Sequence, residues 1–134
     1  LRRHKLPREQ RRQRALDQLD ALGISHLADN SPHTLSGGEK QLLALASVLI
    51  LKPDIVIADE PTTLLDLQNR RRVARALTEL PQQVIVVTHD LDLVRDFDRV
   101  LWIDDSRIVG DSNAQGSGGP RGVIKRYEEA YGGV

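Results

Sequence analysis

The pattern of apolar and polar residues predicts a helix near the start of the chain. It begins near Pro7, because proline suits the first turn of a helix, and it ends at Gly23. Three leucines at helical spacing form its buried side: Leu16, Leu19 and Leu22. Residues 24–34 contain an Asn-Ser-Pro sequence and are expected to form a loop.

A second helix follows the turn-like sequence Ser36-Gly37-Gly38 and ends before Pro53, which cannot continue a helix. Its apolar residues lie on nearly all sides, so we expect this helix to be buried. The short apolar run that follows, residues 55–58, is typical of a central strand in a parallel sheet covered on both faces. The strand ends abruptly at Asp59-Glu60-Pro61.

The remaining pattern continues this alternation of helices and strands. The predicted segments are a helix over residues 68–80, a buried strand over 84–87, a helix over about 91–97, and a hairpin of residues 100–103 and 107–109. Strands alternating with helices predict right-handed crossovers and an α/β fold. Residues 110–122 are rich in Gly and Ser, and we expect a loose linker to a last short helix that carries Ile124, Tyr127 and Tyr131.

Composition limits the classes of function. The chain has 134 residues, enough for one domain, and its 19 Lys and Arg balance 19 Asp and Glu, so no global field attracts nucleic acid or an anionic membrane. The first 14 residues hold seven Lys or Arg without aromatic residues, which indicates a solvated helix face. Because there is no cysteine, disulfides, thiolate metal sites and a cysteine nucleophile are excluded.

Acidic and titratable residues follow both predicted parallel strands, where ligands bind in open α/β sheets. Asp59 ends the first strand and is a natural ligand for Mg²⁺, which takes few carboxylates and keeps several waters. Glu60 points elsewhere and can orient or deprotonate a water, and His89 follows the second strand. Taken alone, Asp59-Glu60-Pro61 is explained equally well as a polar turn that ends a strand.

The segment from Leu35 to Gln41 is a candidate anion site. Its two glycines allow close approach of backbone N–H groups, Ser36 can cap the helix, and the helix dipole favours negative charge. The alternative is an ordinary Ser-Gly-Gly turn that caps a structural helix, and for the tripeptide alone this alternative is preferred.

Together these segments closely resemble the C-terminal half of the ATP-binding cassette (ABC) ATPases. Residues 35–41 match the family signature motif, residues 55–60 resemble its Walker B strand and glutamate, residues 63–66 occupy the place of the D-loop, and residues 88–90 that of the switch histidine. The resemblance implies the C-terminal part of a P-loop NTPase domain, with a mostly parallel sheet flanked by helices. It divides the chain into part of the helical subdomain (1–34), the catalytic core (35–111), and a linker with a short helix (112–134).

The resemblance also implies a role for each matching residue. Ser36, Gly37, Gly38 and Gln41 would bind an ATP held by the opposite subunit, with Ser36, Gly38 and the start of the following helix at its γ-phosphate. Asp59 would support Mg²⁺, Glu60 would act as general base or water-positioner, Asp66 would communicate across the dimer, and His89 would contact the γ-phosphate.

Two departures from the family pattern limit these expectations. No G-x-x-x-x-G-K-[ST] phosphate loop and no glutamine loop occur in the chain, so we expect a C-terminal piece that does not bind ATP usefully by itself. Leu64 and Leu65 replace the small residues common in D-loops, which resembles the ATPases of energy-coupling-factor systems for vitamin and metal-ion uptake.

The expected function is that of an ATP-hydrolysing subunit that powers a membrane transporter. The expected partners are a second ATPase subunit, in a homo- or heterodimer, and transmembrane transporter subunits, with no nucleic acid. The expected location is cytoplasmic, peripheral on the inner face of the cell membrane. Alternatives are an ABC ATPase of the SMC type, which would show long coiled coil before the signature, a ribosome-associated ABC protein, and a non-catalytic truncated product.

Overall fold

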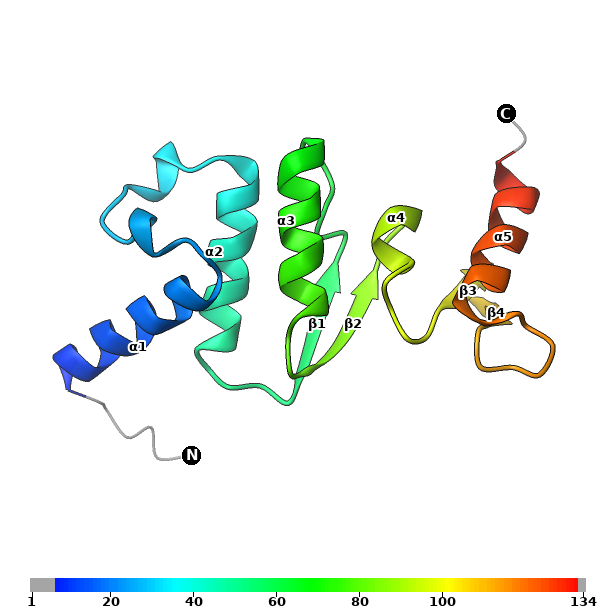
Figure 1. Cartoon of the computed structure of the whole chain (residues 1–134), viewed down its shortest axis with the longest axis horizontal. Helices are drawn as coiled ribbons and strands as arrows, with labels where there is room; N and C mark the ends of the chain where they lie inside the picture. Colours follow the sequence, from blue (N-terminus) through cyan, green and yellow to red (C-terminus); the bar gives the residue numbers. More distant parts are fainter. Residues whose placement is uncertain (1–6, 133–134) are drawn as a thin grey trace. The chain divides into compact units, whose positions relative to one another are not determined.

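The computed structural model describes residues 7–132, and its contacts divide the chain into two compact units (Figure 1). The first unit ends at Val87 and the second begins at Thr88. The basic residues before Pro7 lie outside the described part, whereas the described arginines of the first helix are exposed, as predicted for a solvated face. The predicted division after residues 34 and 111 follows motifs rather than contacts and stays a prediction.

The first unit contains the predicted helix-helix-strand-helix-strand order, and two short 3₁₀ helices lie in the predicted loop. Its elements are α1 (Arg8–Ala21), η1 (Ser25–Leu27), η2 (Pro32–Thr34), α2 (Gly37–Leu49), β1 (Ile55–Asp59), α3 (Leu67–Thr78) and β2 (Gln83–Val87). Strands β1 and β2 pair in parallel, in a register that runs from Ile55 opposite Gln83 to Asp59 opposite Val87. The parallel pair and its connecting helix confirm the predicted crossover unit.

The core of the first unit lies where α2, α3 and one face of the sheet meet. Its fully buried residues are Ile24, Leu42, Val73 and Leu77. Leu19 and Leu22 of the α1 region and Val84 and Val86 of β2 pack against this cluster and are partly buried. Each fully buried side chain of this cluster stabilises the fold by about 1.5–3 kcal/mol, so these contacts hold the helices against the strands.

The prediction that both faces of the strands are covered is wrong for the described residues. Val56 of β1 is buried at 3% exposure, but its neighbour Ile57 is 70% exposed. In β2, Ile85 and Val87 are 44% and 54% exposed. Helices α2 and α3 supply the core on one side of the sheet only, because successive side chains of a strand point to opposite faces.

The prediction that the second helix is buried all round is also wrong. Helix α2 buries one stripe, consisting of Gly38, Leu42, Ala46 and Leu49. Val48 on another side is 45% exposed. Helix α2 therefore carries more apolar side chains than the described elements cover.

The second unit consists of a helical turn, an antiparallel hairpin and a terminal helix. Its elements are α4 (Leu91–Val94), β3 (Leu101–Asp104), β4 (Arg107–Asp111) and α5 (Gly119–Tyr131). Helix α4 is shorter than the predicted helix over about 91–97, whereas the hairpin is confirmed. Trp102 of β3 packs edge-on against Tyr127 and Tyr131 of α5, with ring centroids 5.7 and 5.9 Å apart, and these contacts fix the terminal helix on the hairpin.

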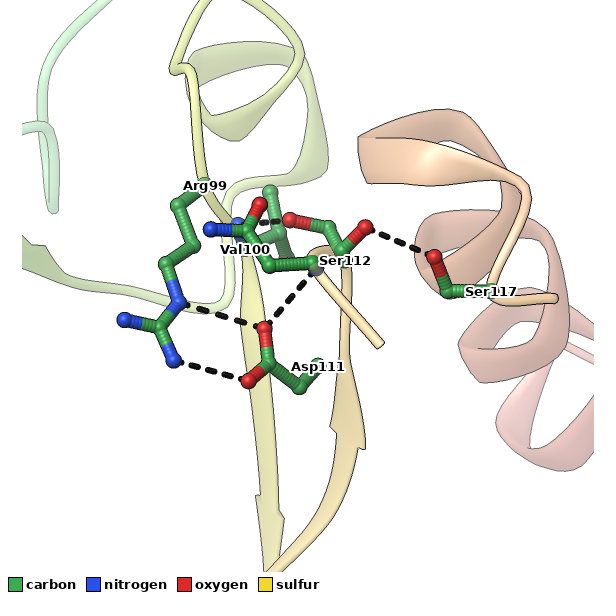
Figure 2. A network of polar contacts seen from close by, with 6 residues as sticks. Arg99, Val100, Asp111, Ser112 and Ser117 are labelled. Atoms are coloured by element: carbon green, nitrogen blue, oxygen red, sulfur yellow. Dashed lines mark hydrogen bonds and ion pairs between the residues drawn. The ribbon is translucent and has the colours of Figure 1, made fainter. Parts of the chain in front are cut away.

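The loose linker predicted over residues 110–122 is replaced by an ordered connection (Figure 2). The hydroxyl of buried Ser112 accepts the backbone N–H of Val100 at 2.9 Å, and the Ser117 hydroxyl donates to the Ser112 carbonyl at 2.6 Å. Arg99 donates two hydrogen bonds to Asp111, at 3.1 and 2.7 Å, which lowers the pKa of that carboxyl. The small polar residues here hydrogen-bond to backbone groups and stabilise a tight turn, so the connection is not a flexible linker.

Candidate functional site

The first part of the candidate site is the start of α2, where Ser36 is the N-cap. The backbone N–H of Glu39 donates to the Ser36 hydroxyl at 3.3 Å, and Glu39 Oε2 accepts the Ser36 backbone N–H at 2.8 Å. The Ser36 hydroxyl also donates to Glu39 Oε2 at 2.8 Å. These bonds from Ser36 lower the pKa of the Glu39 carboxyl and form a capping box, which explains why the helix starts here.

The two glycines of the signature lie against the start of α3. A Cβ atom placed on Gly37 would lie 3.1 Å from Leu65 Cδ2. On Gly38 it would lie 2.6 Å from the Cβ of Asn69, closer than such atoms approach in proteins. Packing between the two helices therefore requires glycine at position 38 and leaves little room at position 37, in addition to the close approach of a ligand that the sequence predicts.

The start of α3 is organised in a similar way around Asp66. Asp66 Oδ1 accepts the backbone N–H of Asn69 at 2.9 Å, and Asp66 Oδ2 accepts the side-chain amide of Asn69 at 2.7 Å. Both bonds lower the pKa of the Asp66 carboxyl, which therefore stays charged. The side chain of Asn69 thus donates a hydrogen bond to Asp66 and also fills the space next to Gly38.

The third part of the site is the end of β1. Asp59 is the last residue of the strand and is exposed. Glu60 follows with a positive φ of 46°, a conformation that non-glycine residues rarely adopt. Its backbone N–H donates to the Val87 carbonyl at 2.8 Å, and its Oε2 accepts the Thr63 hydroxyl at 3.1 Å. The first bond fixes the main chain at Glu60, and the second orients its carboxylate.

The arrangement of the first unit brings these parts to one end (Figure 1). Helices α2 and α3 both begin at the end of the unit where β1 and β2 finish. Of the predicted site residues, Ser36, Gly37, Gly38, Asp59, Glu60 and Asp66 therefore share this end, and half-buried Gln41 lies one turn into α2. This convergence places two helix N-termini and two strand-end carboxylates at the same edge.

The last predicted site residue, His89, belongs to the second compact unit. It is exposed and comes two residues after the last residue of β2. Next to it, the Asp90 N–H donates to the Thr88 hydroxyl at 3.0 Å, and Asp90 caps the short helix α4. These bonds shape the loop in which His89 lies.

Two residues of this region have features that the sequence did not predict: Asn69 joins the starts of α2 and α3, and Leu64 is exposed. Asn69 could have been found from the spacing Asp66-x-x-Asn69, which is typical of a helix start. Leu64 is 99% exposed and adopts a positive φ of 62°. Within residues 7–132, nothing explains an exposed leucine in a left-handed conformation, because it neither buries area nor relieves strain.

The residues present fit a Mg²⁺ ion held mainly by a substrate. Within residues 7–132, no three or more His, Cys, Asp or Glu side chains stand close enough to hold a metal by themselves. Mg²⁺ is usually bound by one or two carboxylates together with substrate phosphates and waters. The exposed carboxylate of Asp59 at the end of β1 can supply that single protein contact.

Comparisons with known proteins agree with the arrangement of these motifs. A family profile described as ABC transporter matches residues 1–63. A Deinococcus radiodurans protein named as an ABC transporter ATP-binding protein is 50% identical over 108 residues, which are 81% of this chain and 48% of that protein. The chain is thus similar to the ATP-binding proteins of ABC transporters. The energy-coupling factor transporter ATP-binding protein EcfA1 of Caldanaerobacter subterraneus is 38% identical over 127 residues, 92% of this chain and 44% of EcfA1.

The solved structure of a protein from an ABC transporter complex shares the fold of this chain. The structure of cbiO1 from Clostridium perfringens, described as part of the ABC transporter complex cbiONQ, superposes with a TM-score of 0.76 and 32% identity. The match covers 97% of this chain and 54% of cbiO1. The predicted fold class, part of an α/β P-loop NTPase domain, is thereby confirmed. The chain spans about half the length of the relatives it matches, at 48% and 44%.

Proposed function

We propose that this chain forms the signature-bearing part of an ATP-hydrolysing subunit that powers a membrane transporter. The observation that carries the proposal is the convergence of the α2 and α3 N-termini with Asp59 and Glu60 at one end of the first unit. A phosphate group and an attacking water need this combination: N–H donors for the anion and a carboxylate for the water.

The start of α2 would bind the γ-phosphate of an ATP held by the opposite subunit. The first N–H groups of a helix have no acceptor within the helix, and together with the dipole they attract an anion. The Ser36 hydroxyl donates to Glu39 in the free chain, so it must turn away from Glu39 to donate to a phosphate. This contact would replace the bond from the Ser36 hydroxyl to Glu39, whereas the two bonds of the capping box do not use the hydroxyl proton.

The end of β1 would carry the hydrolytic chemistry. Bound Mg²⁺ neutralises charge on the phosphates during transfer, and Asp59 would hold it on the protein side. Glu60 would orient the attacking water and accept its proton, in a position fixed by its bonds to Val87 and Thr63. His89 would contact the γ-phosphate, and Asp66 would transmit closure between the two subunits.

The proposed partners are a second ATPase subunit, as homo- or heterodimer, and transmembrane transporter subunits. Support comes from the relatives, which are named ATP-binding proteins of transporters, and from cbiO1, described as part of a transporter complex. Within residues 7–132 no helix is both long and apolar enough to span a bilayer. We place the chain on the cytoplasmic face of the membrane, in a system of the energy-coupling-factor type.

The proposal is tested in a completed cassette, in which residues 1–134 follow an amino-terminal half that carries a Walker A loop. We expect this cassette to hydrolyse ATP in a Mg²⁺-dependent manner, measured as phosphate release at saturating ATP. The 134-residue chain by itself should show no saturable ATP binding by calorimetry, because most phosphate contacts belong to the Walker A loop. A completed cassette that binds ATP but releases no phosphate would contradict the proposed function.

Leu64 gives a prediction about the subunit interface. Because Leu64 is 99% exposed at a φ of 62°, Leu64→Gly should relieve backbone strain of about 1 kcal/mol without losing buried area. The matched variant Leu64→Ala removes the same apolar side chain but keeps the strain. In urea denaturation of the 134-residue chain, we expect Leu64→Gly to be at least as stable as Leu64→Ala.

If the apolar side chain serves the partner subunit, both Leu64 variants should weaken ATP-driven dimerisation of the completed cassette to a similar extent. Analytical ultracentrifugation measures this directly. Normal dimerisation of both variants would show that Leu64 does not contact the partner.

A further inference from the structure

We propose that Asn69 is a positioning residue that joins the D-loop carboxylate of Asp66 to the signature glycine Gly38, so that the two motifs meet the opposite subunit as one rigid unit. The inference rests on the proposed function, since it assigns Asn69 a role in the same trans site. The inference follows from two contacts of the Asn69 side chain, one with Asp66 and the other with Gly38.

The first contact fixes the orientation of the Asp66 carboxylate. Its two oxygens accept the backbone N–H and the side-chain amide of the same residue, Asn69, at 2.9 and 2.7 Å. Two bonds from one residue to both oxygens of a carboxylate leave little freedom to rotate it. Asp66 therefore cannot change its direction without moving the Asn69 side chain.

The second contact fixes α3 against α2. The Asn69 side chain fills the space that a Cβ atom on Gly38 would need, with its own Cβ 2.6 Å from that position. Leu65 lies in the same way against Gly37, at 3.1 Å from the corresponding position. Movement of Gly38 toward a nucleotide must therefore carry Asn69, and with it Asp66, because packed contacts transmit displacement.

A role in capping alone does not explain the Asn69 side chain. The cap of α3 uses the backbone N–H of Asn69, which every residue except proline would offer at this position. Asparagine is also a poorer helix former than alanine. The helix start therefore does not need the side-chain amide of Asn69. The roles left for this side chain are its bond to Asp66 and its packing on Gly38.

The functional test compares three variants in the completed cassette. Asn69→Ala removes the amide and keeps the cap, whereas Asn69→Asp keeps the shape over Gly38 but loses the donor. Gln68→Ala is the control, at the exposed neighbour of half-buried Asn69. We expect both Asn69 variants to lower kcat by about tenfold, an effect typical of residues that act through others. The ATP concentration at half-saturation should change less than twofold, since the Walker A half binds the nucleotide.

The outcomes separate this inference from the function on which it rests. Glu60→Gln in the same cassette serves as the reference for loss of the proposed general base. If wild type hydrolyses ATP, Glu60→Gln does not, and both Asn69 variants keep kcat within twofold, only the positioning role is overturned. If wild type does not hydrolyse ATP, the proposed function and the positioning role both fail.

A second experiment tests the contact on the 134-residue chain without ATP. Gly38→Ala should lower the urea midpoint strongly in wild type, because the new Cβ meets Asn69. In the Asn69→Gly background the same change should lower the midpoint much less, since the obstructing atoms are gone. If Gly38→Ala lowers the urea midpoint equally in both backgrounds, the proposal is overturned, even if the Asn69 variants of the cassette unfold.

Discussion

Replacement of Glu60 by glutamine in the completed cassette is expected to lower ATP hydrolysis by at least about a hundredfold, the scale of a lost general base. Glutamine has nearly the same shape, and its amide oxygen can still accept the Thr63 hydroxyl, which lies 3.1 Å from Glu60 Oε2. The amide cannot accept a proton from the attacking water. The position of the side chain is thus preserved while its chemistry is removed.

ATP binding should persist in Glu60→Gln, because Glu60 does not belong to the nucleotide-binding half. The measurement is phosphate release at saturating ATP, together with nucleotide affinity by calorimetry. A matched control is Glu79→Gln, at the exposed C-cap of α3, the opposite end of that helix from Asp66. Unchanged turnover in Glu60→Gln would remove Glu60 from the role of base, and equal losses in both variants would indicate a general effect of lost charge.

The order of the elements, and the bounds of most elements of the first unit, could be predicted because local residues mark them. Pro7 and Gly23 flank α1, and Pro53 separates α2 from β1. Ser36 was recognisable as a cap, and the structure shows the complete capping box with Glu39. Each of these signals acts within a few residues, so a single sequence is enough to see it.

Burial could not be predicted in the same way, because it depends on what covers a surface. The apolar runs of β1 and α2 indicated full burial, yet Ile57 and Val48 are 70% and 45% exposed in the described chain. An apolar run shows that a surface is suited to being covered, whereas the covering element lies elsewhere in sequence. The exposed sheet face therefore marks a surface that the described elements leave open.

In the candidate site, too, features within a few residues could be predicted, whereas contacts between residues far apart in the sequence could not. The motifs that contain Ser36, Glu60 and Asp66 could be read along the chain. The contact between Asn69 and Gly38 joins residues 31 positions apart, as the difference 69 − 38 gives, and no local pattern encodes it. Its consequence is that Gly38 serves packing as well as ligand approach, so a variant of Gly38 alone does not separate the two effects.

Replacement of Ser36 by arginine should block ATP-driven dimerisation of the completed cassette while each subunit still binds ATP. Ser36 is exposed at the N-cap of α2, where the proposed phosphate of the opposite subunit would lie. The arginine side chain would fill that space, and loss of the cap would cost about 1 kcal/mol of helix stability. Ser36→Ala is the matched control, because it loses the same cap without adding bulk.

The dimerisation is measured by analytical ultracentrifugation in the Glu60→Gln background, in which ATP is bound but not consumed. We expect Ser36→Ala to dimerise with ATP, with affinity reduced by the loss of one hydrogen bond, and Ser36→Arg to remain monomeric. Because both variants lose the capping hydroxyl, a difference between them reports on space at the interface rather than on stability of α2. Normal ATP-driven dimerisation of Ser36→Arg would refute the role of the signature in binding nucleotide across the dimer.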